Sequence, residues 1–262
     1  MKVMGILNVT PDSFSDGGKY IEMDAIVAHA KQMVADGADI IDIGGESTRP
    51  GAQLISEQEE IARVIPIIER LVKEIAVPIS IDTYKAEVAR LAVLAGASYI
   101  NDVGGAKFDE NMPKVMAESK AKVILMHNRS KKTVNSGALT TYENVIEEVK
   151  KELQESIDLV LEAGVKPEHI IVDPGVGFAK DFDANIQVMK HVDCFSELGY
   201  PVLLGVSRKG AIGKMVGDLD VNNRVEGTLA VTCLAAQKGV EIIRVHDVLE
   251  NARAVKAMTY LV

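Results

Sequence analysis

The sequence predicts a (β/α)₈ barrel, in which eight parallel strands alternate with eight helices. Short apolar runs recur eight times in 262 residues, and this number and length are typical of that fold. The runs show no polar alternation, as expected for parallel strands that are buried on both faces. Each run is followed at once by a polar or charged residue and then by a helical pattern.

The predicted strands are 3–7, 40–43, 79–81, 99–100, 123–126, 170–172, 202–206 and 242–243. The carboxyl ends of barrel strands gather on one face, where enzymes of this fold place their active sites. We therefore expect one ring of polar residues on that face. Its members in chain order are Asn8, Glu46, Asp82, Asn101 with Asp102, His127, Asp173, Arg208 with Lys209, and Arg244 with His246.

The segments between the strands carry helical periodicity over 24–35, 56–75, 85–94, 109–119, 141–163, 183–197, 222–238 and 248–258. Gly164 directly follows one of these segments and Ala95-Gly96 follows another, and glycine is favoured just past a helix end. The loops 10–20, 44–55 and 128–140 follow strands and are longer than the loops that precede strands. Extra length on one face indicates a functional face.

The composition narrows the class of protein. With 47% hydrophobic residues the chain can bury a large core, and the repeats use nearly all of residues 1–262, so a single domain is expected. The net charge of −9, without a basic stripe, argues against a nucleic-acid partner. Because the sequence shows neither a secretory signal nor an apolar run of membrane-spanning length, we expect a cytoplasmic protein without a membrane partner.

Several other functions lack their motif. Cys194 and Cys233 belong to no C-x-x-C pair and are expected to be free thiols rather than zinc ligands. The segment 175–177 lacks the third glycine of a dinucleotide-binding fingerprint. The segment 205–211 lacks the Gly-Lys-Ser/Thr of a phosphate-binding P-loop.

Two loops on the predicted functional face are rich in polar groups. NVTPDSFSDGG at 8–18 offers amide, hydroxyl and carboxylate oxygens, and GGESTRPG at 44–51 offers hydroxyls and a guanidinium suited to a diphosphate. Each loop alone could be a Gly/Pro-rich connector. Asp82 and Asp173 could likewise each cap a helix. Together with Asn101, however, they supply the carboxylates and amide that a planar heterocycle with adjacent N–H donors requires.

Taken in order, seven segments resemble the dihydropteroate synthases of bacterial folate biosynthesis. They are NVTPDSFSDGG at 8–18, DIGGESTRPG at 42–51, SIDT at 80–83, INDVGG at 100–105, DPGVGFAK at 173–180, SRK at 207–209 and RVHD at 244–247. The resemblance implies a (β/α)₈ barrel that joins (7,8-dihydropterin-6-yl)methyl diphosphate to 4-aminobenzoate and releases diphosphate, with Mg²⁺ as cofactor. It also implies a homodimer formed through helices late in the chain.

Residue by residue, the resemblance implies that the pterin is held by Asp82, Asn101, Asp173 and Lys209, with Met126 packed on its ring. It implies that Asn8 contacts Mg²⁺ or the diphosphate. The substrate-binding set further includes Thr48, Arg49, Arg244, Val245 and His246, of which all but Val245 are expected to bind the anion. Phe178 and Lys209 are expected to border the 4-aminobenzoate site.

The expected chemistry needs no covalent nucleophile, because positioning and electrostatic stabilisation suffice for a neutral amine that displaces diphosphate. Asp82, Asp173 and Lys209 are the predicted catalytic residues. Two alternatives remain open. A methyltetrahydrofolate-dependent methyltransferase has a similar pterin-binding barrel, but it has no use for an anion site. A non-catalytic pterin-binding paralogue would be indicated by loss of Asn8, Arg49, Lys209 or His246, and all four are present.

Overall fold

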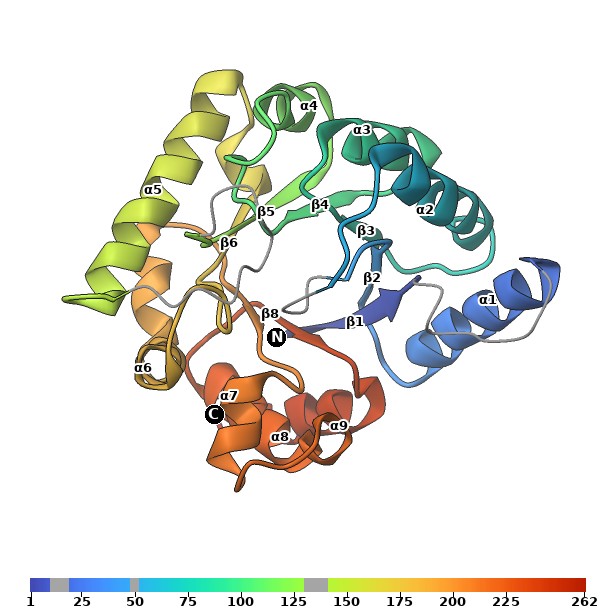
Figure 1. The fold of residues 1–262 in the computed structure, drawn as a ribbon. Coiled ribbons are helices and arrows are strands. Elements are labelled where there is room, and N and C mark those ends of the chain that lie inside the picture. Colours follow the sequence, from blue (N-terminus) through green and yellow to red (C-terminus); the bar gives the residue numbers. More distant parts are fainter. Residues whose placement is uncertain (10–18, 48–51, 130–140) are drawn as a thin grey trace.

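The computed structural model describes residues 1–9, 19–47, 52–129 and 141–262, and within these ranges it has eight parallel strands and nine α-helices. The strands are β1 (Lys2–Asn8), β2 (Ile40–Gly44), β3 (Ile79–Asp82), β4 (Tyr99–Asp102), β5 (Lys122–Met126), β6 (Ile170–Asp173), β7 (Leu203–Gly205) and β8 (Ile242–Val245). Each lies on a predicted apolar run. The predicted (β/α)₈ barrel is therefore confirmed, with helices arranged around the sheet (Figure 1).

The α-helices are α1 (Lys19–Ala35), α2 (Glu57–Leu71), α3 (Ala86–Ala95), α4 (Met112–Glu118), α5 (Val145–Ala163), α6 (Phe182–Lys190), α7 (Gly210–Met215), α8 (Val225–Gln237) and α9 (Val248–Met258). Three short 3₁₀ helices accompany them in the described part of the chain: η2 (Pro167–His169), η3 (Val192–Leu198) and η4 (Val221–Asn223). The single helix predicted over 183–197 is thus wrong, because α6 ends at Lys190 and η3 follows. The short helix α7 was not predicted.

Local capping explains several helix ends. The Ser56 hydroxyl accepts the Glu59 N–H at 3.1 Å, and Asn144 and Asp181 cap α5 and α6 in the same way. Side-chain acceptors of this kind satisfy N–H groups that have no partner inside the helix. At the other ends of α3 and α5, Gly96 and Gly164 adopt left-handed backbone with φ of 116° and 105°. These are the two glycines that the sequence marks as helix ends.

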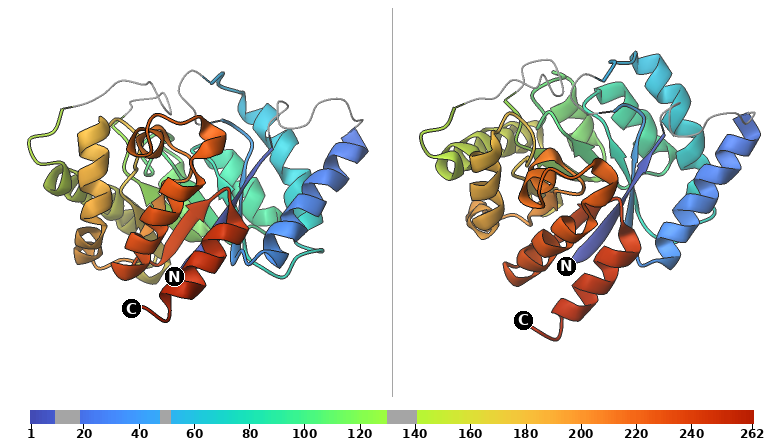
Figure 2. Two further views of the ribbon diagram at one scale, coloured as in Figure 1. Left: turned by 90° about the horizontal axis from the view of Figure 1, so that it is seen from below. Right: turned by 60° about the horizontal axis from the view of Figure 1, so that its bottom comes forward.

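The strands pair in the order β6-β5-β4-β3-β2-β1-β8-β7. The barrel closes between β6 and β7 through one isolated bridge, Val172 with Val202, and the Val172 N–H donates to the Pro201 carbonyl at 3.0 Å. Figure 2 shows both chain ends at one end of the barrel, where β1 begins. Because the strands are parallel, their carboxyl ends meet at the opposite end.

Side-chain alternation divides each strand between two environments, because successive residues point to opposite faces. Inside the barrel, near the start of the strands, one apolar layer consists of Met4, Ile40, Tyr99, Ile124, Ile171, Leu203 and Ile242. The alternate residues, including Ile41, Ile81, Leu125 and Val245, lie in the large core between sheet and helices. Residues two positions beyond the inner layer must again point inward, toward the carboxyl ends.

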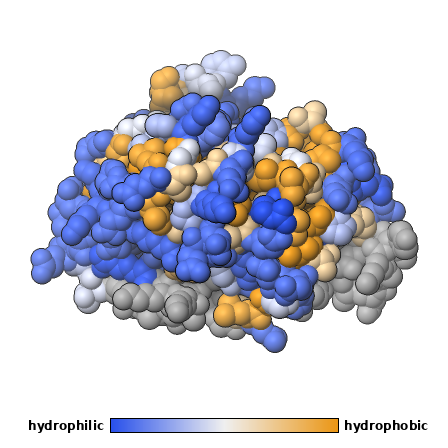
Figure 3. All heavy atoms as spheres, turned by 90° about the horizontal axis from the view of Figure 1, so that it is seen from above, coloured by the Kyte–Doolittle hydropathy of each residue, from blue (hydrophilic) through white to orange (hydrophobic). Residues whose placement is uncertain are grey.

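The outer surface is mixed in polarity. On the side formed by α3, α4 and α5, apolar residues make separate patches among hydrophilic side chains (Figure 3). In the described ranges, no helix is both long and apolar enough to cross a membrane. Cys194 and Cys233 are free and half-buried, as predicted.

Candidate active site

The inward positions beyond the apolar layer hold the polar cluster. Moving two residues along from Ile40, Tyr99, Ile124, Ile171, Leu203 and Ile242 gives Asp42, Asn101, Met126, Asp173, Gly205 and Arg244. Asp82 joins them from β3, paired in register with Gly44 and Asn101. The alternation of the strands thus brings the predicted pterin-binding residues of β3 to β6 into one interior cluster with Arg244.

Arg244 lies at the centre of this cluster. Its Nε donates to Oδ2 of Asp42 and its Nη2 donates to Oδ2 of Asp82, each at 2.6 Å. The Asn101 amide also donates to Oδ2 of Asp42, at 3.2 Å. Asp42 is fully buried, and the side chains of Asp82 and Arg244 are 9% and 18% exposed. Charge-assisted bonds of this kind are stronger than neutral ones, so the guanidinium is held in a fixed orientation.

Burial governs the protonation of the carboxyls. It raises the pKa of Asp82, against the lowering effect of Arg244, because a desolvated carboxylate is disfavoured. Burial also raises the pKa of Asp173, and Lys209 opposes it. For Arg244, burial acts to lower the pKa, but the carboxylates of Asp42 and Asp82 outweigh it and the pKa is raised. The Arg244 cation therefore remains charged, while Asp82 and Asp173 keep their protons to higher pH than free aspartates do.

Lys209 approaches the cluster from the turn after β7. Its Nζ donates to the Val176 carbonyl and lies 4.8 Å from the centre of the Phe178 ring. Burial lowers the pKa of Lys209 to about 8, while Asp173 acts in the opposite direction. A Cβ at Gly177, where φ is 84°, would come within 3.0 Å of Lys209 Cδ. The glycine therefore leaves the space through which the lysine side chain passes.

An apolar group borders the polar cluster. Met126, Val103 and Phe178 are buried together, and Tyr84 packs against them. Met126 pairs in register with Asp173, so the methionine and the carboxylate point inward side by side. An apolar surface beside convergent polar groups is typical of small-molecule sites.

The structure places only some of the residues that are predicted to bind the anion. Asn8 is half-buried at the end of β1, and His246 is half-buried with its Nδ1 3.1 Å from the Ser207 hydroxyl. Thr48 and Arg49 lie outside the described residues. The structure does not bring Val245 to the cluster: its side chain alternates with Arg244 and lies fully buried in the core toward the helices. The side chain of Val245 thus faces the helices, and a role of this residue in substrate binding stays a prediction.

Four members of the predicted ring point elsewhere. Glu46 accepts from Lys85, Tyr84 and the Ile55 N–H, and so fixes the loop after β2. Asp102 accepts from the Gly104 and Ala106 N–H groups, each at 2.7 Å. Arg208 pairs with Asp247, and His127 points to Lys180 and Glu152. These side chains shape the loops around the site rather than face its interior.

Asp42 is the member of the cluster that sequence reasoning missed. It lies inside an apolar run, Ile40 to Ile43, rather than at the strand end where polar residues were sought. The signal that would have found it is its place two residues after inward-facing Ile40. One of its oxygens, Oδ1, has no hydrogen-bond partner among the residues that the structure describes, and the same holds for Ser80 Oγ, its neighbour in register.

The residues of the cluster could hold Mg²⁺ only together with ligands from a bound substrate. In the described part of the chain, no group of three His, Cys, Asp or Glu residues could hold a metal ion. Asn8 places one amide oxygen near Gly44 and Asp82 at the cluster, since a Cβ on Gly44 would lie 3.8 Å from both Asn8 Oδ1 and Asp82 Oδ2. Mg²⁺ commonly takes one or two protein oxygens together with substrate phosphates and water. The residues present therefore fit a cation that is bound together with a diphosphate.

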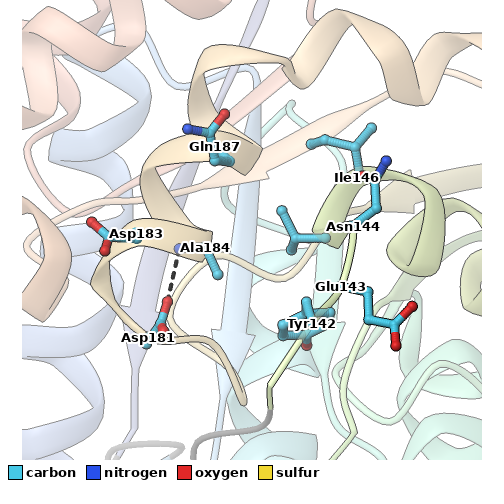
Figure 4. Close-up of a pocket in the computed structure, with 9 residues that line it drawn as sticks. Tyr142, Glu143, Asn144, Ile146, Asp181, Asp183, Ala184 and Gln187 are labelled. Atoms are coloured by element: carbon cyan, nitrogen blue, oxygen red, sulfur yellow. Dashed lines mark hydrogen bonds between the residues drawn. The ribbon is translucent and has the colours of Figure 1, made fainter.

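A separate surface pocket of about 340 Å³ lies between the starts of α5 and α6 (Figure 4). Its lining includes Tyr142, Asn144, Asp181, Asp183 and Gln187. Asp181 is engaged as the cap of α6, through the Ala184 N–H at 2.8 Å. None of the lining residues is a predicted site residue, so the pocket is not part of the candidate site.

Residues 4–246 match the family described as "Pterin binding enzyme". The dihydropteroate synthase of Bacillus subtilis (strain 168) is 55% identical over 98% of this chain and 87% of its own length. The crystal structure of a dihydropteroate synthase from Clostridium difficile in the presence of pteroic acid has a TM-score of 0.93 at 47% identity, covering 99% of this chain and 96% of that one. The Xanthomonas albilineans enzyme with 4-aminobenzoic acid has a TM-score of 0.92 at 44% identity, covering 99% and 92%.

The barrel, its interior acids and amide, and the family match define a pterin-binding (β/α)₈ enzyme fold. Since the similarity to dihydropteroate synthases extends over nearly the full length of both chains, the chain belongs to the dihydropteroate synthase family.

Proposed function

We propose that this protein joins (7,8-dihydropterin-6-yl)methyl diphosphate to 4-aminobenzoate, giving 7,8-dihydropteroate and diphosphate. The observation that carries the proposal is the inward cluster of Asp82, Asn101 and Asp173 beside Lys209, in a chain that is 55% identical to a dihydropteroate synthase. The cluster offers carboxylates and an amide to a planar heterocycle. A solved relative obtained with 4-aminobenzoic acid supports this second substrate, and one obtained with pteroic acid supports a product that joins a pterin to 4-aminobenzoate.

The reaction forms one C–N bond and breaks one C–O bond at the pterin methylene. The neutral amine of 4-aminobenzoate attacks this carbon, diphosphate departs with the bonding electron pair, and the amine then loses one proton. Asp82 and Asp173 would stabilise positive charge on the pterin as the C–O bond stretches. Arg244, together with His246 just after the same strand, would stabilise the negative charge that builds on the leaving diphosphate.

Mg²⁺ is part of this proposal. When bound with the diphosphate, the ion would neutralise leaving-group charge, and Asn8 is the described residue that would hold it. The proposal is tested by the dependence of the rate on Mg²⁺. Asn8→Ala is expected to raise the Mg²⁺ concentration required for half-maximal rate, and an unchanged requirement would remove Asn8 from this role.

Lys209→Ala tests the function and the site together. Diphosphate release and dihydropteroate formation are measured with Mg²⁺, with and without 4-aminobenzoate. We expect wild-type product formation and a loss of about 10- to 100-fold in kcat/KM for the variant, because a charged hydrogen-bond donor is removed. Lys214→Ala is the matched control, since Lys214 is exposed on α7 and its Nζ lies 5.8 Å from the centre of the Phe182 ring.

The two alternative functions give different results in this assay. Tight pterin binding by the wild-type protein without dihydropteroate formation would indicate the methyltransferase or the non-catalytic paralogue. The first of these would transfer a methyl group from methyltetrahydrofolate, and the second would not.

We further propose a homodimer in the cytoplasm, as the resemblance implies. Late in the chain, the segment from α7 to η4 exposes Met215, Leu219 and Val221, at 43%, 41% and 37%. These residues are candidates for the interface. Light scattering on the 28.3 kDa chain distinguishes the states, and a monomer at micromolar concentration would reject the dimer. Recovery of the protein outside the cytoplasmic fraction of its cells would reject the location.

A further inference from the structure

Lys180 is a buried lysine whose role the proposed reaction does not explain. It lies between β6 and α6 and is 4% exposed. Its Nζ is 3.0 Å from the Gly175 carbonyl, 3.3 Å from the Phe178 carbonyl and 2.8 Å from Nδ1 of His127. An ammonium group has three donors, and here each has one acceptor. All three donors of the side chain are therefore used, and none of these three bonds goes to an interior acid.

The ring of His127 connects this ammonium to a carboxylate. Burial, followed by the charge of Lys180, lowers the pKa of His127 to about 4, so the ring is neutral. A neutral ring that accepts at Nδ1 carries its proton on Nε2, which lies 3.0 Å from Glu152 Oε2. Glu152 also accepts from Arg129 at 2.8 Å. Hydrogen bonds thus run from Lys180 through His127 to a compensating negative charge on α5.

The other two acceptors of Lys180 lie in the turn that follows β6. This turn has unusual backbone, with φ of 68° at Gly175, 84° at Gly177 and 49° at Ala179. A non-glycine residue rarely adopts such an angle, so surrounding contacts must hold the turn in place. Two lysines do so from different positions: Lys180 binds the Gly175 carbonyl, and Lys209 binds the Val176 carbonyl.

We propose that Lys180 is a positioning residue for the 4-aminobenzoate subsite. By binding the carbonyls of Gly175 and Phe178, it sets the position of the Phe178 ring and of the Val176 carbonyl that receives Lys209. The family resemblance implies that Phe178 and Lys209 border that subsite, so this inference rests on the proposed function. Of the residues expected to hold the pterin, Asp82 and Asn101 lie on other strands, whereas Asp173 and Lys209 contact the turn through the Gly175 N–H and the Val176 carbonyl.

Lys180→Met tests the inference, because methionine keeps the length of the side chain and removes its donors. We expect the KM for 4-aminobenzoate to rise about tenfold, as the Phe178 carbonyl loses a buried donor. The KM for the pterin diphosphate should rise by only about threefold or less, because Asp82 and Asn101 still hold the pterin from strands outside the turn. Lys150→Met is the matched control: it also removes the ammonium group of a bonded lysine, but Lys150 pairs with Glu147 of α5 and Glu197 of η3, away from the turn. It should change neither KM.

A purely structural role would lower the melting temperature and the yield of active enzyme without separating the two KM values. Equal KM values in Lys180→Met and wild type, at normal wild-type turnover, would overturn the inference. If wild type makes no dihydropteroate, the proposed function fails instead. Lys180→Gln covers the case in which the methionine variant does not fold, because the amide can still donate to one carbonyl. It should raise the KM for 4-aminobenzoate about threefold, and no rise would also overturn the inference.

Discussion

Asp42 illustrates how much one buried side chain determines at the mouth of the barrel. It is fully buried, and a single oxygen accepts from both Arg244 and Asn101. A guanidinium offers five donors in a rigid fork, so its direction follows from the acceptors around it. With Asp82 on one side alone, Arg244 would have no second acid to hold its Nε. Asp42 therefore orients the cation that the proposed reaction uses against the diphosphate.

Asp42→Asn should lower kcat/KM for the pterin diphosphate by about tenfold or more, because Arg244 loses one of its two buried anionic partners. Steady-state kinetics with varied pterin diphosphate measures the effect. Asp36→Asn is the control, since Asp36 accepts from Gln32 at the exposed end of α1 and touches no site residue through that bond. Wild-type kinetic constants in Asp42→Asn would contradict the assigned role.

Asp102 gives a prediction about pH and stability. Burial raises its pKa to about 7, from the ordinary value of 3.8, although two backbone N–H groups act in the opposite direction. Between these two pH values the folded protein binds more protons at this site than the unfolded chain does. The free energy of unfolding then falls as pH rises. The stabilisation contributed by Asp102 is therefore fully present below about pH 4 and is lost as pH rises through about 7.

The measurement is urea unfolding at a series of pH values from about 4 to 8. Over this range the free energy of unfolding of wild type should fall by up to about 4 kcal/mol relative to that of Asp102→Asn, whose side chain does not titrate. The comparison uses the difference in slope between the two proteins, since other groups titrate in both. Parallel curves would show that Asp102 ionises in the folded state as freely as in the unfolded chain.

At the scale of elements, the turn after β6 is the most constrained connection near the site. A Cβ at Gly175 would lie 2.0 Å from the His127 carbonyl oxygen, in addition to the cost of a φ of 68°. Gly199, which ends η3, has a comparable φ of 84° with open space around it. A substitution at Gly199 therefore measures backbone strain alone, whereas one at Gly175 adds a steric clash.

Gly199→Ala should reduce the free energy of unfolding by about 1 kcal/mol, the usual cost of a left-handed alanine. Gly175→Ala should cost about 3 kcal/mol or more, because the His127 carbonyl and the turn must move apart. Chemical denaturation of both variants gives the comparison. Equal losses would mean that the turn can shift away from β5 without cost.

The elements were predictable from the sequence to the extent that local pattern determines them. The strands and most helices follow from apolar runs and from capping residues such as Ser56 and Gly96. The break between α6 and η3 was missed because residues 183–197 keep a helical pattern of apolar residues across the break. Helix α7, only six residues long, is held by the loop around Arg224, which lies later in the chain.

The site was predictable where a strand ends and unpredictable where a contact joins distant segments. Asp82, Asn101, Met126 and Asp173 were found because they stand at or near strand ends. Lys180 was missed because its partner His127 lies 53 residues away, and no local pattern records that contact. Which strand-end residues face inward depends on the alternation phase of each strand. In β8 the alternation directs Arg244 inward and Val245 outward, and the sequence prediction did not take this alternation into account.

At the scale of the whole molecule, the barrel is held unequally around its circumference. β1 pairs with β2 over five positions and with β8 over four, whereas β6 and β7 share one isolated bridge. Local opening requires the least free energy where the fewest backbone hydrogen bonds must break. The seam between β6 and β7 is therefore where the barrel should open first.

Hydrogen exchange tests this expectation by mass spectrometry. Amides of β7 are expected to exchange about tenfold or more faster than amides of β1 and β2. The peptide that covers β8 serves as an internal reference, since β8 pairs with both β1 and β7. Uniform protection across β1, β2 and β7 would contradict a weak seam.

The alternation of inward and outward residues also limits how this chain can change during evolution. Exchanging one side chain for another at an inward position alters one contact, as in Asp42→Asn. Deleting or inserting one residue within β8 would instead exchange the directions of Arg244 and Val245, burying a cation among the helices and leaving an apolar group among the acids. The strands should thus accumulate substitutions but not changes in length. Length variation among homologous sequences should be confined to the loops between the strands and helices.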